Sequence, residues 1–140
     1  MNSDPHNLQR FLGAQAPVFN QVLAELRAGR KRTHWMWFIF PQIAGLGSSP
    51  MAQHFAISGR TEAVAYLAHP TLGPRLRECT QLVNQIPNRA IDEIFGYPDD
   101  LKFCSSVTLF AAVAPGEAAF RAALDQYFAG QPDPATLARL

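Results

Sequence analysis

Four polar residues at helical spacing are the strongest candidates for chemistry in this chain. They are Asp99, Lys102, Ser105 and Ser106. Steps of three and four residues place side chains on one face of a helix. A lysine with hydroxyl groups at a helix start can hold an anion, because the free N–H groups and dipole there attract negative charge. The alternative is structural: the acidic residues cap the helix, Lys102 extends to water, and the serines bond back to backbone carbonyls.

Both tryptophans of the chain fall in one short aromatic block, residues 34–42, with the sequence HWMWFIFPQ. Trp35 and Trp37 offer flat faces on which a ligand ring can stack. His34 precedes them, either as an acid, base or hydrogen-bond donor to a ligand, or as a structural residue bonded to backbone. A nucleotide-like or other phosphate-bearing ligand suits this mixture of aromatic and polar groups.

A hydrolytic form of this hypothesis uses a carboxylate as general base. Asp99 or Asp100 is the candidate, and an N-glycosidic or ADP-ribosyl-type bond is the candidate substrate, by analogy with helical ADP-ribosyl N-glycosidases. Helix capping explains the same two residues. The sequence has no P-loop, no GxGxxG and no GxSxG motif. The histidines lack metal-ligand spacing, so we expect neither a metal site nor a cofactor.

The hydrophobic pattern predicts an all-α fold. An apolar stripe with steps of four and three is formed by Leu72, Leu76, Cys79, Val83 and Ile86. A segment from about 99 to 114 is apolar nearly all round in its second half, as a central helix is. We expect residues 1–140 to form a compact, single-domain orthogonal bundle of about seven to eight helices around that buried helix.

Two further helices are predicted from more ambiguous patterns. The aromatic block is apolar on every face, and we interpret it as a buried helix over 34–40 capped by Thr33, although its residue types also favour a strand. Thr61 is expected to cap a helix with Val64, Leu67 and Ala68 facing inward.

A basic patch precedes the aromatic block. It consists of Arg27, Arg30, Lys31 and Arg32. Such a patch can bind phosphate. The simpler interpretation is that cations at the end of one helix complement its dipole.

The composition limits the class of protein. The chain has 140 residues, is 48% hydrophobic and 16% charged, and has a formal net charge of +1. Such a chain folds into a globule and has no overall field to attract nucleic acid. Cys79 and Cys104 form no CxxC motif, which suits a reduced, cytoplasmic protein. We see no signal peptide and no apolar run of about 18 to 20 residues, and therefore expect no membrane partner.

Several motifs together resemble an uncharacterised bacterial family. They are His34 to Ile43 (HWMWFIFPQI), Tyr66 to Pro70 (YLAHP), Ile94 to Ser106 (IFGYPDDLKFCSS) and Thr108 to Phe110 (TLF). Members of this family are often labelled "calpastatin" in genomes, and a mycobacterial hypothetical protein is its structural type. The resemblance implies a mainly α-helical single domain and no established activity, cofactor or site residue. It does not support the calpastatin label, because calpastatin inhibitory segments are disordered.

Two functions of different classes remain open. In the first, the protein binds a small molecule in a pocket formed by the aromatic and polar residues above. In the second, it is a non-enzymatic helical module that binds a protein or a second copy of itself. Convergence of Lys102, Ser106, His34 and a tryptophan on one concavity would favour the pocket. Fully packed tryptophans with no cavity would favour the module.

Overall fold

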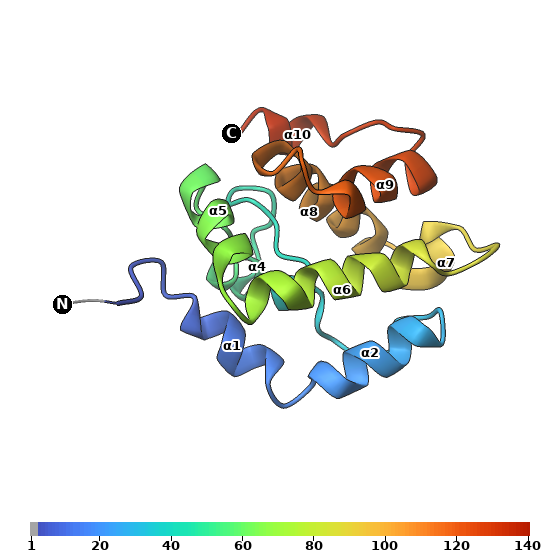
Figure 1. Ribbon diagram of the computed structural model, residues 1–140, viewed down its shortest axis with the longest axis horizontal. Helices are drawn as coiled ribbons and strands as arrows, with labels where there is room; N and C mark the ends of the chain where they lie inside the picture. Colours follow the sequence, from blue (N-terminus) through green and yellow to red (C-terminus); the bar gives the residue numbers. More distant parts are fainter. Residues whose placement is uncertain (1–2) are drawn as a thin grey trace.

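The computed structural model describes residues 3–140, and within this range all regular structure is helical (Figure 1). The helices are α1 (Gln9–Gln15), α2 (Phe19–Arg27), α3 (Met36–Ile39), α4 (Pro50–His54), α5 (Arg60–Ala68), α6 (Leu72–Asn84), α7 (Ile91–Phe95), α8 (Asp99–Val113), α9 (Ala118–Tyr127) and α10 (Pro134–Leu137). The described residues contain no strand beyond an isolated bridge between Ile43 and Ile57. The all-α prediction is confirmed. The helix number exceeds the expected seven to eight because several helices are single turns.

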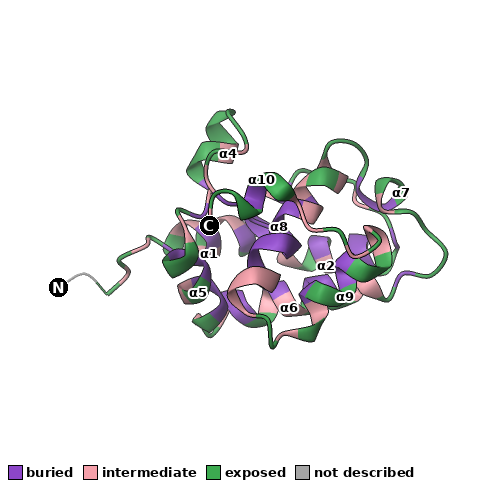
Figure 2. Cartoon of the chain, turned by 90° about the horizontal axis from the view of Figure 1, so that it is seen from above, coloured by how far each residue is buried: buried purple, intermediate pink, exposed green. Residues whose placement is uncertain are grey.

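The long helix α8 lies at the centre of the molecule. Helix α8 contacts α5, α7, α9 and α10 (Figure 1). The second long helix, α6, contacts α2, α5 and α9. Every residue from 105 to 110 is buried, and the middle of α8 is accordingly coloured as buried in Figure 2. The predicted central helix over 99–114 is therefore confirmed. No helix among residues 3–140 combines the length and the apolar character needed to cross a membrane.

The aromatic block forms a shorter helix than the sequence suggested. Helix α3 covers only Met36–Ile39, and Thr33 does not cap it. The Thr33 hydroxyl instead donates to a carboxylate oxygen of Glu25 at 2.6 Å. The helix ends before Phe40 because Phe40 precedes Pro41, and a residue before a proline is sterically disfavoured in the helical conformation.

A buried carboxylate fastens this block to α2. Glu25 is 3% exposed. Its Oε1 accepts hydrogen bonds from the amides of Arg32 (2.6 Å) and Thr33 (3.0 Å) and from the indole N–H of Trp35 (3.0 Å). Its Oε2 accepts from Thr33 and from the Gln21 amide at 3.0 Å. The position of the aromatic block therefore depends on Glu25, which lies on the preceding helix α2.

Helix α5 is rotated relative to our expectation. It begins at Arg60 after Gly59 and not at a Thr61 cap, and Val64 is 50% exposed. The buried face instead carries Tyr66, which is fully buried. The side-chain amide of Gln15 donates to the Tyr66 hydroxyl at 3.1 Å. This aromatic ring and its buried partner determine which face of α5 turns inward.

Helices α5 and α6 approach closely at Gly73, where we expect Gly73→Ala to destabilise the fold. A Cβ at this position would clash with the backbone carbonyl of Leu67 and lie 2.8 Å from the Arg77 guanidinium. Overpacking of this kind typically costs about 1 to 3 kcal/mol. Urea denaturation measures the loss. The matched control is Gly13→Ala in α1, where nothing lies within 4 Å and alanine is the better helix former. Equal stability of the two variants would contradict this account.

Candidate functional site

Two lysines, an aspartate and both tryptophans come together at the start of α8. The Asp99 carboxylate lies 2.9 Å from Lys31 Nζ and 3.4 Å from Lys102 Nζ. Each ammonium also sits above an indole ring, Lys31 at 5.2 Å from the centroid of Trp35 and Lys102 at 5.2 Å from that of Trp37. We call Lys31, Asp99 and Lys102 the lysine–aspartate cluster.

The cluster contains two cations and one anion, and all three side chains are at least partly buried. The Lys31 side chain is 8% exposed, and that of Lys102 is 25% exposed. Lys31 is thus fully engaged, while Lys102 retains a solvent-facing side that can accept a second anionic partner. Both oxygens of Asp99 contact an ammonium group. Asp99 is therefore engaged in positioning the lysines and is not free to contact a substrate.

A groove of about 420 Å³ adjoins this cluster, between the first two turns of α8 and the segment that leads into α4. We call it the α8 groove. Its lining combines polar residues (Gln42, Ser48, Ser49, Lys102 and Ser105) with apolar ones such as Leu46, Pro98 and Leu101. Lys102 is the one charged side chain among the described residues that line it. The groove is therefore a concavity of mixed polar and apolar character with a single cationic contact.

The two predicted serines have different positions. The Ser105 hydroxyl lies 3.2 Å from the Leu101 carbonyl and 2.9 Å from Asp133 Oδ2, so it bonds back along α8 and holds the start of α10. Its side chain lines the groove, but its hydroxyl group already has two hydrogen-bond partners. Ser106 is fully buried, and its hydroxyl has no hydrogen-bond partner among residues 3–140. Ser106 does not line the groove, and its full burial keeps it from contacting a ligand there.

The remaining predicted site residues do not converge on the groove. Trp35 is 1% exposed and bonded to Glu25, so its ring faces are not accessible for ligand stacking. His34 is exposed and lies outside the groove lining. Asp100 is half-buried, and its Oδ1 accepts the amide of the next residue, Leu101, at 2.9 Å. Of the two tryptophans, only the half-buried Trp37 is placed to influence the groove, through Lys102.

Backbone donors at the start of α8 are already used. The amide of Asp100 donates to the Gly96 carbonyl at 2.9 Å. The amides of Leu101 and Lys102 donate to the Pro98 carbonyl at 3.0 and 3.2 Å. The helix start therefore supplies fewer free N–H groups than the sequence pattern suggested. An anion in the groove would depend on the Lys102 ammonium group.

Neither cysteine has the character of an activated nucleophile. Burial raises the pKa of the Cys79 thiol to about 12. Burial likewise raises the pKa of Cys104, which is half-buried on α8. Reactive cysteines need a lowered pKa, so thiol chemistry is not a candidate activity of this region.

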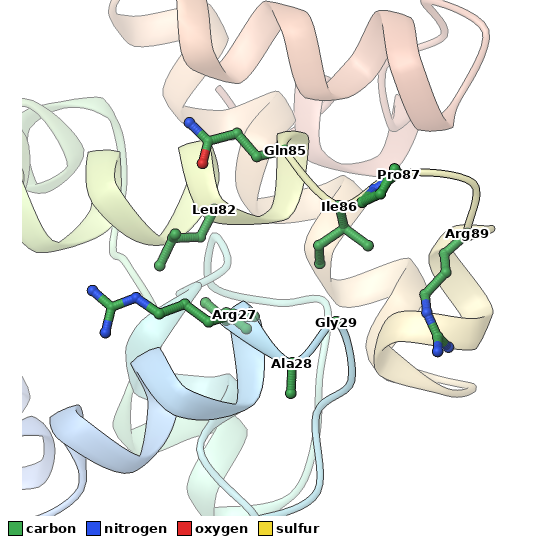
Figure 3. Close-up of a pocket in the computed structure, with 9 residues that line it drawn as sticks. Arg27, Ala28, Gly29, Leu82, Gln85, Ile86, Pro87 and Arg89 are labelled. Atoms are coloured by element: carbon green, nitrogen blue, oxygen red, sulfur yellow. The ribbon is translucent and has the colours of Figure 1, made fainter.

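A second concavity, of about 340 Å³, lies between the ends of α2 and α6 (Figure 3). Arg27 and Arg89 line it, and Figure 3 shows their guanidinium groups well apart, on opposite sides of the view. Two helix C-termini, which carry partial negative charge, meet here, so the arginines complement dipoles. Lys31, which we assigned to the basic patch, forms an ion pair with Asp99. The positive charge of the patch is therefore partly neutralised by Asp99.

Sequence reasoning missed Lys31 as a member of the cluster and Gln42 and Ser48 as groove residues. Lys31 was assigned to the basic patch because its neighbours in the chain are arginines. Its partner Asp99 is remote in sequence and gives no local signal.

Comparisons with known proteins agree with this fold. Residues 5–140 match the model of a family described as "Protein of unknown function (DUF1810)". The crystal structure of the conserved hypothetical protein Rv1873 from Mycobacterium tuberculosis is similar, with 59% sequence identity, 98% of each chain covered and a TM-score of 0.97. A search of curated proteins finds no match. The predicted membership in an uncharacterised bacterial family is confirmed: the chain belongs to the DUF1810 family of proteins of unknown function.

Proposed function

We propose that this protein binds a small, phosphate-bearing ligand in the α8 groove, with the Lys102 ammonium group as the main anion contact. The observation that carries the proposal is the position of Lys102. Among the described residues that line the groove, it is the one with a charged side chain. Its ammonium group is held by an ion pair with Asp99 and by the ring of Trp37. A cation fixed in place before binding loses less side-chain entropy when the ligand arrives.

The other groove residues suit the polar part of such a ligand. Gln42 and Ser48 line the groove and can donate hydrogen bonds to phosphate or hydroxyl oxygens. Gly47 brings backbone close to the ligand volume. Hydrolysis of an N-glycosidic bond receives less support, because both oxygens of Asp99 are engaged with lysines. We therefore limit the proposal to ligand binding.

A second candidate function rests on exposed apolar side chains around the same groove. Leu101 lines the groove and is 53% exposed. Tyr97 and Met51, which adjoin lining residues in the sequence, are 81% and 40% exposed. Exposed apolar patches often mark protein interfaces. A protein partner or a second copy of the chain would bury them, and light scattering of the purified protein with Tyr97→Ser as a comparison would reveal such a dimer.

We expect Lys102→Ala to abolish ligand binding without unfolding the protein. A thermal-shift screen tests this with inorganic phosphate, nucleotides, ADP-ribose and sugar phosphates. A ligand at a hundred times its dissociation constant stabilises the native state by about 2.7 kcal/mol. This stabilisation should be absent in Lys102→Ala, whose own stability should change by no more than about 1 kcal/mol because the charge is partly solvated.

Two controls sharpen the screen. Lys102→Arg keeps the charge and should retain part of the binding. Arg30→Ala removes an exposed cation that does not line the groove and should bind as the wild type does. A ligand that stabilises Lys102→Ala as strongly as the wild type would refute the role of Lys102. A panel in which no anion stabilises the wild type would refute the proposed function.

A further inference from the structure

An apolar pocket lies toward the other end of α8, away from the α8 groove. It encloses about 240 Å³ between the second half of α8, α9 and α10. Its lining is dominated by Ala111, Ala112, Pro115, Leu124, Pro132 and Leu137. Leu137 on α10 is 44% exposed, so one wall of the pocket is an apolar side chain open to solvent.

Small side chains on α8 contribute to the space in this pocket. Ala111 and Ala112 occupy consecutive positions on α8 where larger residues would fill the space. Apolar cavities of about 150 Å³ stay free of water and accept a benzene-sized ligand. The size and lining here therefore suit one aromatic ring with a short extension.

The mouth of the pocket carries a cation that can take a further partner. Two charged residues line it, Glu117 and Arg121. Glu117 is already bound by Arg77 Nε, at 2.7 and 3.0 Å from its two oxygens. The Arg121 side chain is 59% exposed, forms an ion pair of 3.3 Å with the similarly exposed Asp125, and donates a long hydrogen bond of 3.5 Å to the Gly130 carbonyl. The charge available to a ligand at this mouth is therefore a guanidinium group.

We propose that this pocket is a second binding site, for a small aromatic carboxylate. The ring lies among the alanine and proline residues, and the carboxylate pairs with Arg121 in place of Asp125. Guanidinium groups bind carboxylates through two parallel hydrogen bonds, which makes arginine the preferred partner for this group. The proposal is independent of ligand binding in the α8 groove.

The test compares an acid with its neutral analogue, 3-phenylpropionate and 3-phenylpropan-1-ol, by NMR titration of the labelled protein. Wild type should bind the acid about two- to fivefold more tightly than the alcohol, as expected for one solvent-exposed ion pair. Arg121→Gln should remove this preference while leaving alcohol binding unchanged. Asp125→Asn frees Arg121 from its neighbour and should strengthen binding of the acid.

Further variants separate this site from the α8 groove. Ala112→Leu fills the pocket and should abolish binding of both probes, whereas Lys102→Ala should bind both as the wild type does. Arg121 and Asp125 are exposed, so their variants should keep the native spectrum and decide the question even if Ala112→Leu misfolds. The proposal is overturned if neither probe binds, if the preference for the acid survives in Arg121→Gln, or if the shifted resonances lie away from α8, α9 and α10.

Discussion

Trp35→Ala is expected to lower the free energy of unfolding by about 3 to 5 kcal/mol, the usual cost of removing a large buried aromatic side chain. Trp35 is 1% exposed and packs against Phe40 and Phe95, with ring centroids at 6.2 and 6.3 Å. Its indole N–H also donates to Glu25. The variant therefore leaves both a cavity in the core and an acceptor with one donor fewer.

Trp37→Ala is the matched control, because Trp37 lies two residues away and is only half-buried. Its loss of stability should be clearly smaller. Chemical denaturation of both variants gives the comparison. Trp35→Phe retains most of the ring but not the N–H group, and should fall between the wild type and Trp35→Ala. Equal costs for Trp35→Ala and Trp37→Ala would mean that the two rings do not have the burial described.

Acid is expected to weaken the protein through Glu25. Burial by itself raises the pKa of this carboxyl group, but hydrogen bonds from Thr33, Arg32 and Gln21 outweigh it and lower the pKa from 4.5 to about 2. A lowered folded-state pKa stabilises the native state above pH 4.5, and this contribution disappears as the pH falls toward 2. It amounts to about 3 kcal/mol, since one pKa unit corresponds to about 1.4 kcal/mol.

Glu25→Gln isolates this effect. The variant should be less stable than wild type at neutral pH, and the difference should narrow between pH 4.5 and 2. Glu78→Gln, which changes an exposed carboxylate on α6, should follow the wild-type curve throughout. Stability is measured by urea denaturation across this pH range. Parallel curves for wild type and Glu25→Gln would show that Glu25 is not held in its charged form by the fold.

Local signals were sufficient for much of the fold. The stripe that includes Leu76 and Val83 predicted α6, and the near-continuous apolar run predicted α8, because a helix reveals itself through its own periodicity. The N-caps at Ser49 and Asp133 are equally local features, since each side chain accepts an amide from its own first turn. These features need no knowledge of distant residues.

Features that depend on distant partners could not be predicted in the same way. Thr33 was assigned to a helix cap, but its hydroxyl serves Glu25 on another helix. Val64 was expected inside, but Tyr66 and its bond from Gln15 set the orientation of α5. In each case a buried polar contact between remote segments outweighed the local pattern.

The candidate site shows the same division. Helical spacing correctly placed Asp99, Lys102 and Ser105 near one another. It could not show that Ser106, one position further, turns into the core. Nor could it show that Lys31, from a distant part of the chain, pairs with the second carboxylate oxygen of Asp99. Spacing along one helix gives neighbours on that helix, and packing between helices decides which of them reach a groove.

The most direct test of the ligand-binding proposal uses the two tryptophans as reporters. The indole N–H of Trp35 is buried against Glu25, whereas the ring of Trp37 lies under the Lys102 ammonium group. Two-dimensional NMR of the labelled protein separates their signals during a titration with the best anion from the screen. We predict a saturable shift of the Trp37 signal with Trp35 unchanged, and no shift in Lys102→Ala. A bound anion that leaves Trp37 unmoved, or that moves it equally in Lys102→Ala, would contradict a binding site centred on Lys102.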